Sequence, residues 1–240
     1  MNNLSTVSDA KRKFNAQHSR PINSIFRRVV EELLVEMHLL SVNEGFVYDS
    51  IYALGMVSSF DKFMADYRPE ADKASIFAAL CQSIDSTTEK YRQDASAIKA
   101  AAAQLQGTDV LAKVAELASG QGGDALAQAL QSIGKNPKFK YSRLFGIGLF
   151  DLLEDVATDK FADETSRTET VNKLSEALNL PADKLGKDLD SYRSSLAKLV
   201  QMQAAMADII EADRKKREQR EQDKATAAAA TTTAATETPE

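Results

Sequence analysis

Apolar residues recur at helical spacing along most of this 240-residue chain. The strongest pattern lies between residues 22 and 42, where apolar positions are three or four residues apart and would share one wide face of an α-helix. Pro21 stands at the start of this segment, where its missing N–H costs nothing, and residues 43–45 end it. The apolar positions are Ile22, Ile25, Phe26, Val29, Val30, Leu33, Leu34, Met37 and Leu40.

Shorter apolar patterns predict further helices. Residues 86–89 and 166–169 fit capping boxes, and Tyr141 to Val156 is apolar nearly all round, as in a core helix. Gly and Pro, at 10 and 5 residues, are too few for a turn-rich β fold. The fold class is therefore predicted to be all-α. The expected helices lie near residues 50–67, 76–84, 88–107, 110–117, 126–133, 141–156 and 166–178.

The last predicted helix is the longest. Nothing stops it between Pro181 and about Lys224, which gives a length of about 65 Å. Its apolar residues step by four and three, as in a heptad seam. We expect three regions: a compact helical domain at 1–180, a coiled-coil-like helix at 181–224, and a disordered Ala/Thr tail at 225–240. The candidate partner-binding residues of this seam are Leu189, Tyr192, Leu196, Leu199, Met206 and Ile210.

The seam has two possible uses. A helix that projects needs a partner helix, whereas one that folds back packs its seam on the rest of the chain. The sequence leaves both open.

Charge is unevenly distributed along the chain. The formal net charge is −5 and the pI about 5.3, which argues against a nucleic-acid partner. Two segments nevertheless hold basic residues and no acidic one, at 10–30 and 135–150. They indicate either a surface for an anionic partner, such as a membrane or an acidic protein, or a solvated face without a partner. These basic residues are Lys11, Arg12, Lys13, Arg20, Arg27, Arg28, Lys135, Lys138, Lys140 and Arg143.

Residues for catalysis or metal binding are scarce. The single cysteine, Cys81, lies on an apolar face and is expected to be a small buried core residue. His18 and His38 are too dispersed for a catalytic pair, and neither belongs to the Glu-x-x-His motif of a di-iron bundle. The acidic residues Asp151, Glu154 and Asp155 are expected to form a solvated edge, with an acidic contact patch as the alternative. We therefore predict no catalytic, cofactor-binding or metal-binding residue.

No segment of the sequence is predicted to cross or enter a membrane. The longest apolar run has about seven residues, far below the roughly 20 that a spanning helix needs. The N-terminal residues are basic but have no apolar signal-peptide core.

Several long blocks of sequence resemble one family. They are TVSD at 6–9 with KRKF at 11–14, HSRPINS at 18–24, FRRVVEELLVEMHLLSVN at 26–43, YDSIYALG at 48–55, YSRLFGIGLFDLLE at 141–154, KDLDSYRSSLAKLVQ at 187–201 and RKKREQR at 214–220. Together they are similar to the thylakoid-formation proteins of cyanobacteria and plastids, which are also called photosystem II biogenesis factors. The resemblance covers about residues 4–90 and 138–220.

The resemblance implies an all-helical, non-enzymatic accessory protein. Its implied role is photosystem II assembly and repair at the thylakoid membrane, in peripheral association with the cytoplasmic side. The implied partner is a membrane-anchored AAA protease of the FtsH type, whose complexes such a protein binds and stabilises. Because no transit peptide precedes the matched blocks, the resemblance implies a cyanobacterial member.

Two other classes of function stay open. One is a scaffold or chaperone that acts directly on photosystem II intermediates or chlorophyll proteins, without the protease. The other is a helical enzyme, which a bound metal, haem or pigment in the purified protein would indicate.

Overall fold

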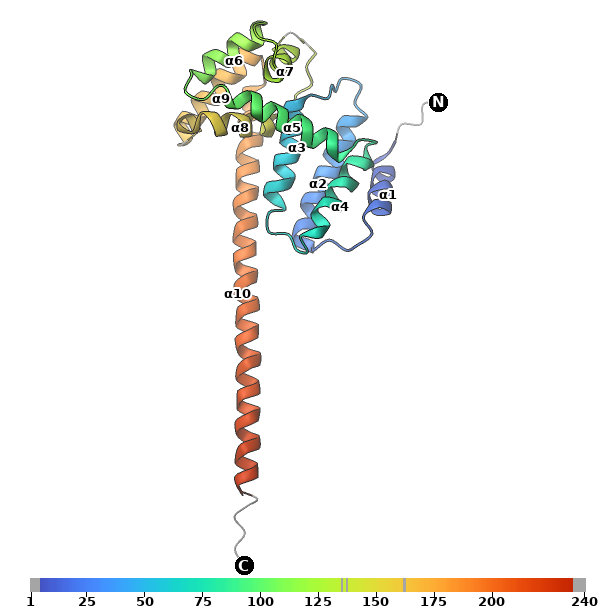
Figure 1. The fold of residues 1–240 in the computed structure, drawn as a ribbon, viewed down its shortest axis with the longest axis vertical. Helices are drawn as coiled ribbons and strands as arrows, with labels where there is room; N and C mark the ends of the chain where they lie inside the picture. Colours follow the sequence, from blue (N-terminus) through green and yellow to red (C-terminus); the bar gives the residue numbers. More distant parts are fainter. Residues whose placement is uncertain (1–4, 135, 137, 162, 235–240) are drawn as a thin grey trace, which may run out of the picture. The chain divides into compact units, whose positions relative to one another are not determined.

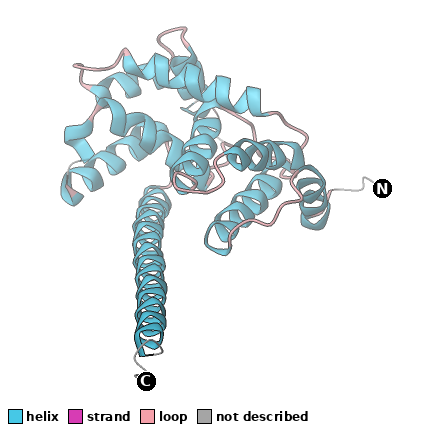
Figure 2. Cartoon of the chain, turned by 60° about the horizontal axis from the view of Figure 1, so that its bottom comes forward, coloured by secondary structure: helices cyan, strands magenta, loops and turns pink. Residues whose placement is uncertain are grey.

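The computed structural model describes the backbone at residues 5–134, 136, 138–161 and 163–234, and the side chains of these ranges up to Arg220 except at 207 and 210. Within these ranges every regular element is helical, and no strand occurs (Figure 2). The predicted all-α class is confirmed. The elements in Figure 1 are α1 (Val7–Gln17), α2 (Ser24–Ser41), α3 (Ser50–Phe63), α4 (Ala71–Ser83), α5 (Thr88–Ala103), α6 (Val110–Ser119), α7 (Ala125–Gly134), α8 (Arg143–Val156), the 3₁₀ helix η1 (Thr158–Phe161), α9 (Glu164–Leu178) and α10 (Ala182–Ala234).

Short polar side chains begin most of the helices. The capping boxes predicted at 86–89 and 166–169 are not formed. The N-cap of α5 is Thr87, whose hydroxyl accepts from the backbone N–H of Lys90 at 3.3 Å, and the N-cap of α9 is Asp163, three residues before the predicted one. The Ser142 hydroxyl accepts from Phe145 N–H at 3.1 Å at the start of α8. Such caps satisfy the free N–H groups of the first turn and fix where each helix starts.

One helix was not predicted. The segment before residue 18 is mostly polar, yet Val7–Gln17 forms α1. Its start is a capping box in which Asp9 N–H donates to the Thr6 hydroxyl at 3.2 Å and Thr6 N–H donates to the Asp9 carboxylate at 2.9 Å. Ala10 and Phe14 form its buried face, and His18, the residue that follows the helix, continues this spacing of four and is also buried. The Thr-x-x-Asp pattern at residues 6–9 is the sequence feature that could have predicted the start of this helix.

Helices α3 and α8 form the centre of the core. Gly55 of α3 and Gly148 of α8 lie where the two backbones meet: a Cβ atom at Gly55 would overlap the carbonyl oxygen of Leu144, and one at Gly148 would overlap that of Ile51. Close approach of this kind requires glycine. Helix α8 is buried on nearly all sides, as predicted for residues 141–156.

The chain divides into two compact units, Met1–Ser194 and Ser195–Glu240. The first unit contains the start of α10, so its boundary lies beyond residue 180, the predicted end of the globular domain. Leu185, Leu189 and Tyr192 explain the difference, because all three are buried and add to the core of the first unit.

The last helix also ends later than predicted. Helix α10 reaches Ala234, past Lys224, so residues 225–234 of the predicted disordered tail have helical backbone. Alanine, the strongest helix former, supplies half or more of this segment. The rest of the predicted tail, 235–240, lies outside the described residues.

Candidate functional site

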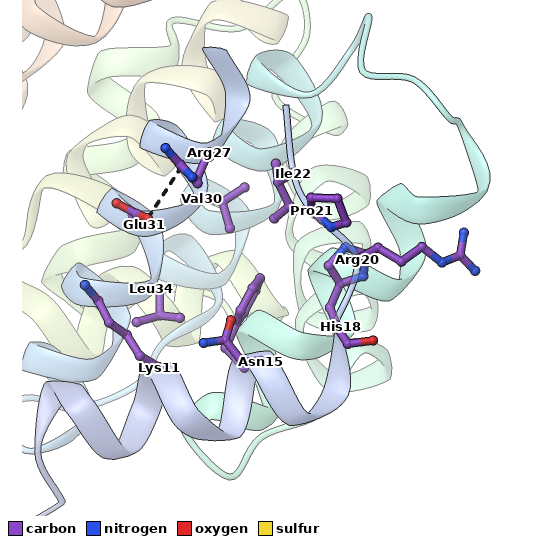
Figure 3. Close-up of a pocket in the computed structure, with 12 residues that line it drawn as sticks. Lys11, Asn15, His18, Arg20, Pro21, Ile22, Arg27, Val30, Glu31 and Leu34 are labelled. Atoms are coloured by element: carbon purple, nitrogen blue, oxygen red, sulfur yellow. Dashed lines mark ion pairs between the residues drawn. The ribbon is translucent and has the colours of Figure 1, made fainter. Parts of the chain in front are cut away.

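A pocket of about 450 Å³ lies between α1, α2 and the segment that joins them. Figure 3 shows Lys11 and Asn15 on α1, and Arg27, Glu31 and Leu34 on α2. The apolar part of its lining comes from Phe14, Pro21, Ile22, Val30 and Leu34. The pocket thus combines an apolar interior with three of the predicted basic residues, Lys11, Arg20 and Arg27.

The three basic residues of the pocket differ in their partners. Arg27 Nε lies 3.9 Å from Glu31 Oε1, and both side chains are largely exposed. Arg20 extends away from the other residues in Figure 3, and its Nη1 donates to the buried Asp72 carboxylate of α4 at 2.6 Å. For Lys11 no carboxylate of the described residues lies within ion-pair distance. Lys11 and Arg27 are therefore the cations that a ligand in the pocket would meet.

The other basic residues of segment 10–30 lie outside the pocket. Arg12 pairs with Asp9 at 2.7 Å and Arg28 with Glu32 at 3.0 Å, each on its own helix. Lys13 pairs with Asp85 at 2.7 Å. These pairs are solvent-exposed and contribute little to stability, so the cations can exchange partners readily.

The second basic segment is not a single surface. Lys138 and Lys140 are exposed in the loop before α8. Arg143 is half-buried, and its guanidinium donates twice to Glu36 of α2, at 2.6 and 3.0 Å. Burial opposes its charge, but Glu36 raises the pKa of Arg143 above its ordinary value. Arg143 therefore joins α8 to α2. The fourth predicted residue of this segment, Lys135, lies outside the described residues.

His18 is a buried polar residue in the pocket wall. Its ring is 4% exposed, and Nδ1 lies 3.0 Å from the Ser75 hydroxyl. Nε2 is buried and has no hydrogen-bond partner among the described residues. A buried ring nitrogen without a partner is uncommon, so the pocket wall has one unmet hydrogen bond.

The predicted seam of α10 contains both buried and exposed residues. Leu189 and Tyr192 are 3% and 4% exposed in the first unit. The Tyr192 ring packs edge-on against Phe63 of α3, with 5.6 Å between ring centroids. These two seam residues are thus core residues. Here the seam packs on the rest of the chain, which is one of the two uses that the sequence left open.

The second unit presents the remaining seam residues. Leu196, Leu199 and Met206 belong to it: Leu199 is buried at 7%, Leu196 is half-buried, and of these three only Met206 is exposed. The side chain of Ile210 lies outside the described residues. Large apolar side chains are exposed here: Val200 at 62%, Met202 at 50%, Met206 at 40% and Ile209 at 67%. Residues 202, 206 and 209 are spaced by four and three and share one face of the helix. We call these three residues the outer stripe.

Asp151 is not part of a solvated edge. It is 2% exposed and accepts from the Ser58 hydroxyl at 2.6 Å and from Lys62, while Lys99 Nζ lies 3.2 Å away. Burial raises its pKa, but the hydrogen bonds from Lys62 and Ser58 and the charges of Lys62 and Lys99 outweigh this and hold the pKa of Asp151 below its ordinary value. The Asp151 carboxylate thus links α3, α5 and α8. The helical spacing of Asp151 did not distinguish it from Glu154 and Asp155, and for this reason all three were expected at a solvated edge.

Chemically reactive groups are few. Cys81 is fully buried, as predicted, and burial raises the pKa of its thiol to about 12. Among the residues that the structure describes, no three His, Cys, Asp or Glu side chains are grouped so that they could hold a metal ion. Over the same residues, no helix has an apolar stretch long enough to cross a bilayer.

The sequence matches the family described as "Thylakoid formation protein" over residues 6–221. The chain belongs to this family. Members similar to it include Protein Thf1 of Trichormus variabilis, 54% identical over 90% of this chain and 92% of the relative, and Protein Thf1 of Crocosphaera subtropica, 53% identical over 90% and 88%. The matched range of the thylakoid formation protein family contains both the pocket and the outer stripe.

A solved structure supports the fold of this family member. The structure of Psb29 is 41% identical in sequence, with a TM-score of 0.76, and covers 89% of this chain and 98% of the solved one. The family resemblance predicted from the sequence is confirmed.

Proposed function

We propose that this family member is a non-enzymatic accessory factor for thylakoid biogenesis and for photosystem II assembly and repair. In this proposal it acts by binding and stabilising a membrane-anchored AAA protease of the FtsH type. The family match over residues 6–221 supports the thylakoid role. The likeness to Psb29, a protein that carries a photosystem II subunit name, supports the connection with that complex.

The outer stripe of α10 carries the protease contact in this proposal. The observation behind it is the exposure of Met202, Met206 and Ile209, at 50%, 40% and 67%, on one face of the helix. Large apolar side chains gathered on one face are typical of a surface that a partner covers. An amphipathic helix of this kind binds a groove or another helix through residues spaced by three and four.

The basic residues carry the membrane contact. Lys138 and Lys140 are exposed, and so are Lys11, Arg12 and Arg28. Basic side chains near an anionic membrane surface each contribute about 1 kcal/mol to binding. The protein is therefore proposed to lie peripherally on the cytoplasmic side of the thylakoid membrane, beside the protease.

A pull-down from gently solubilised thylakoid membranes tests the protease contact. The baits are the intact chain, the double variant Met202→Glu/Met206→Glu, and the control Gln201→Glu/Ala204→Glu, which adds the same charge at exposed positions off the stripe. Mass spectrometry quantifies the captured protease subunits. We expect capture by the intact chain and the control, and a loss of about tenfold or more with the stripe variant.

Two results would contradict the proposal. Equal capture of protease subunits by all three baits would mean that the outer stripe is not the contact. Capture of photosystem II intermediates without protease subunits, at low and high salt, would favour the scaffold function and reject the protease function.

A further inference from the structure

We propose that the pocket between α1 and α2 binds one anionic amphiphile, with its charged headgroup at Lys11 and Arg27 and its apolar tail against Pro21 and Ile22 and the floor formed by Phe14, Val30 and Leu34. The family comparisons assign no ligand to these residues. The inference deepens the membrane-contact part of the proposed function, and it is independent of the protease contact at α10.

The interior of the pocket suits an apolar tail. Phe14, Val30 and Leu34 are 7%, 2% and 3% exposed, so they close the floor but leave little surface to cover. Pro21, which is exposed, and Ile22, which is half-buried, supply the accessible apolar surface from the joining segment. A tail that covers the exposed parts of Pro21 and Ile22 gains about 25 cal/mol per Å² of apolar surface that it removes from water. A small hydrophilic anion would leave this surface exposed and would gain nothing from it.

The rim of the pocket suits a negative headgroup. Lys11 has no carboxylate partner among the described residues, and Arg27 has only an exposed pair to Glu31 at 3.9 Å. Because exposed pairs of this length contribute little, Arg27 can exchange Glu31 for a ligand oxygen at small cost. His18, whose buried Nε2 has no hydrogen-bond partner among the described residues, lies in the same wall.

The size of the pocket favours a small molecule over a protein segment. Its volume of about 450 Å³ lies within the range of roughly 300–1,000 Å³ typical of small-molecule sites. A stable protein interface covers about 800 Å² on each partner, and a continuous apolar surface of that extent is not part of this lining. A single amphiphile therefore fits the pocket better than an acidic peptide does.

Calorimetric titration of the full chain tests the proposal. The probes are dodecyl phosphate below its critical micelle concentration, inorganic phosphate, and an uncharged alkyl glucoside of similar chain length. We expect saturable binding of one dodecyl phosphate per chain, and binding of the other two probes that is at least tenfold weaker. Equal binding of inorganic phosphate would mean an anion site without a tail, and would overturn the proposal.

A pair of charge variants tests the headgroup contacts. Lys11→Gln/Arg27→Gln removes the two cations that line the pocket, and the control Arg12→Gln/Arg28→Gln removes two neighbours that do not line it. Both variants change the net charge equally and keep Arg20, which pairs with the buried Asp72. We expect the first variant to bind dodecyl phosphate about tenfold or more weakly and the control to bind it normally. Equal weakening by both would show general attraction by the basic surface, not a site.

A pair of blocking variants tests the place of the tail. Asn15→Trp puts a bulky ring at the pocket, and Ala16→Trp puts the same ring at an exposed neighbouring position that does not line it. We expect Asn15→Trp alone to abolish binding of dodecyl phosphate. Unchanged binding by Asn15→Trp, with far-UV circular dichroism showing an intact fold, would place the tail elsewhere.

Vesicle flotation connects the pocket to a membrane. Vesicles of phosphatidylcholine with phosphatidylglycerol are expected to bind the wild type and Ala16→Trp and not Asn15→Trp. Lys11→Gln/Arg27→Gln is expected to lose more vesicle binding than Arg12→Gln/Arg28→Gln, which removes only general attraction to the membrane. If the two pocket variants float like the wild type, the pocket does not take a lipid from the membrane, and the proposal fails. The protease pull-down distinguishes this failure from a failure of the proposed function, because the proposed protease contact lies on α10 and not at the pocket. Normal protease capture by the pocket variants, together with unchanged flotation, would reject the pocket proposal and leave the proposed function in place.

Discussion

The two parts of α10 show one sequence pattern used in two ways. Up to Ser194 the apolar residues Leu185, Leu189 and Tyr192 are at most 4% exposed, and they belong to the core of the first unit. From Ser195 onward Leu199 is still buried, at 7%, but the large apolar side chains beyond it, at residues 200, 202, 206 and 209, are 40% to 67% exposed. Helical periodicity shows that a face is apolar, but it does not show what covers that face.

The two parts also differ in how their helical structure is maintained. The inner part packs Tyr192 against Phe63, and tertiary packing is the main source of helix stability in proteins. The outer part relies on helix propensity and on exposed pairs four residues apart, such as Lys215 with Glu211 at 2.7 Å. Each such pair is worth only about 0.3–0.5 kcal/mol, so we assign stability to the inner part and binding to the outer one.

The largest expected effect tests the close packing of α3 on α8 in the core of the first unit. Gly148→Ala would place a Cβ atom on the carbonyl oxygen of Ile51 and force α3 and α8 apart. We expect a loss of about 3 kcal/mol or more in the free energy of unfolding, measured by urea denaturation.

Gly186→Ala is the matched control for this substitution. Gly186 lies in the inner part of α10, and a Cβ atom there would meet nothing within 4 Å. The added methyl group should stabilise the helix by about 0.5–1 kcal/mol. Equal effects of the two substitutions would contradict the close packing of α3 on α8.

The next prediction compares the two parts of α10 directly. Leu189→Ala removes a buried side chain and is expected to cost about 3 kcal/mol, whereas Met206→Ala removes an exposed one and should change stability by less than about 0.5 kcal/mol. Chemical denaturation of both variants measures the difference. If Met206→Ala were as costly as Leu189→Ala, Met206 would be a core residue and the division of α10 would be wrong.

A smaller effect concerns the buried carboxylate that joins three helices of the core. Asp151→Asn removes the charge that Lys62 and Lys99 face, and is expected to cost about 2 kcal/mol at pH 7. Because the pKa of Asp151 is held below its ordinary value of 3.8, its stabilisation is complete above that value and is lost as the pH falls through the lowered pKa. The difference between wild type and variant should therefore shrink below about pH 4.

Urea titrations at pH 7, 5 and 3 measure this dependence. Asp155→Asn serves as the control, because Asp155 is 58% exposed and pairs with Lys99 only at the surface. A pH-independent difference for Asp151→Asn would mean that its charge contributes nothing to the core.

Much of the fold followed from residue patterns. Apolar spacing located α2 and α8, and the polar run at 86–89 located the start of α5, although not as the capping box that was predicted there. These features are local, so a single stretch of sequence contains them. Helix α1 was missed because its apolar residues are few, although Thr6 and Asp9 carry its capping box.

The candidate site depended on contacts between distant residues. Sequence pattern placed Lys11 and Arg27 in one basic segment, but only the packing of α1 beside α2 brings them to the same pocket. The partners of Arg143 and Asp151, Glu36 and Lys62, are 107 and 89 residues away. Ion pairs across such separations leave no periodic signal, and for this reason Asp151 was expected at a solvated edge.

The most direct test of the central claim is site-specific photocrosslinking from the outer stripe in thylakoid membranes. A photoreactive side chain replaces Met206 in one variant and Ala204, two residues away and off the stripe, in the other. The account predicts a crosslink from position 206 to a subunit of the FtsH-type protease, and none from position 204. Crosslinks from position 206 to photosystem II proteins alone, or equal protease crosslinks from both positions, would contradict it.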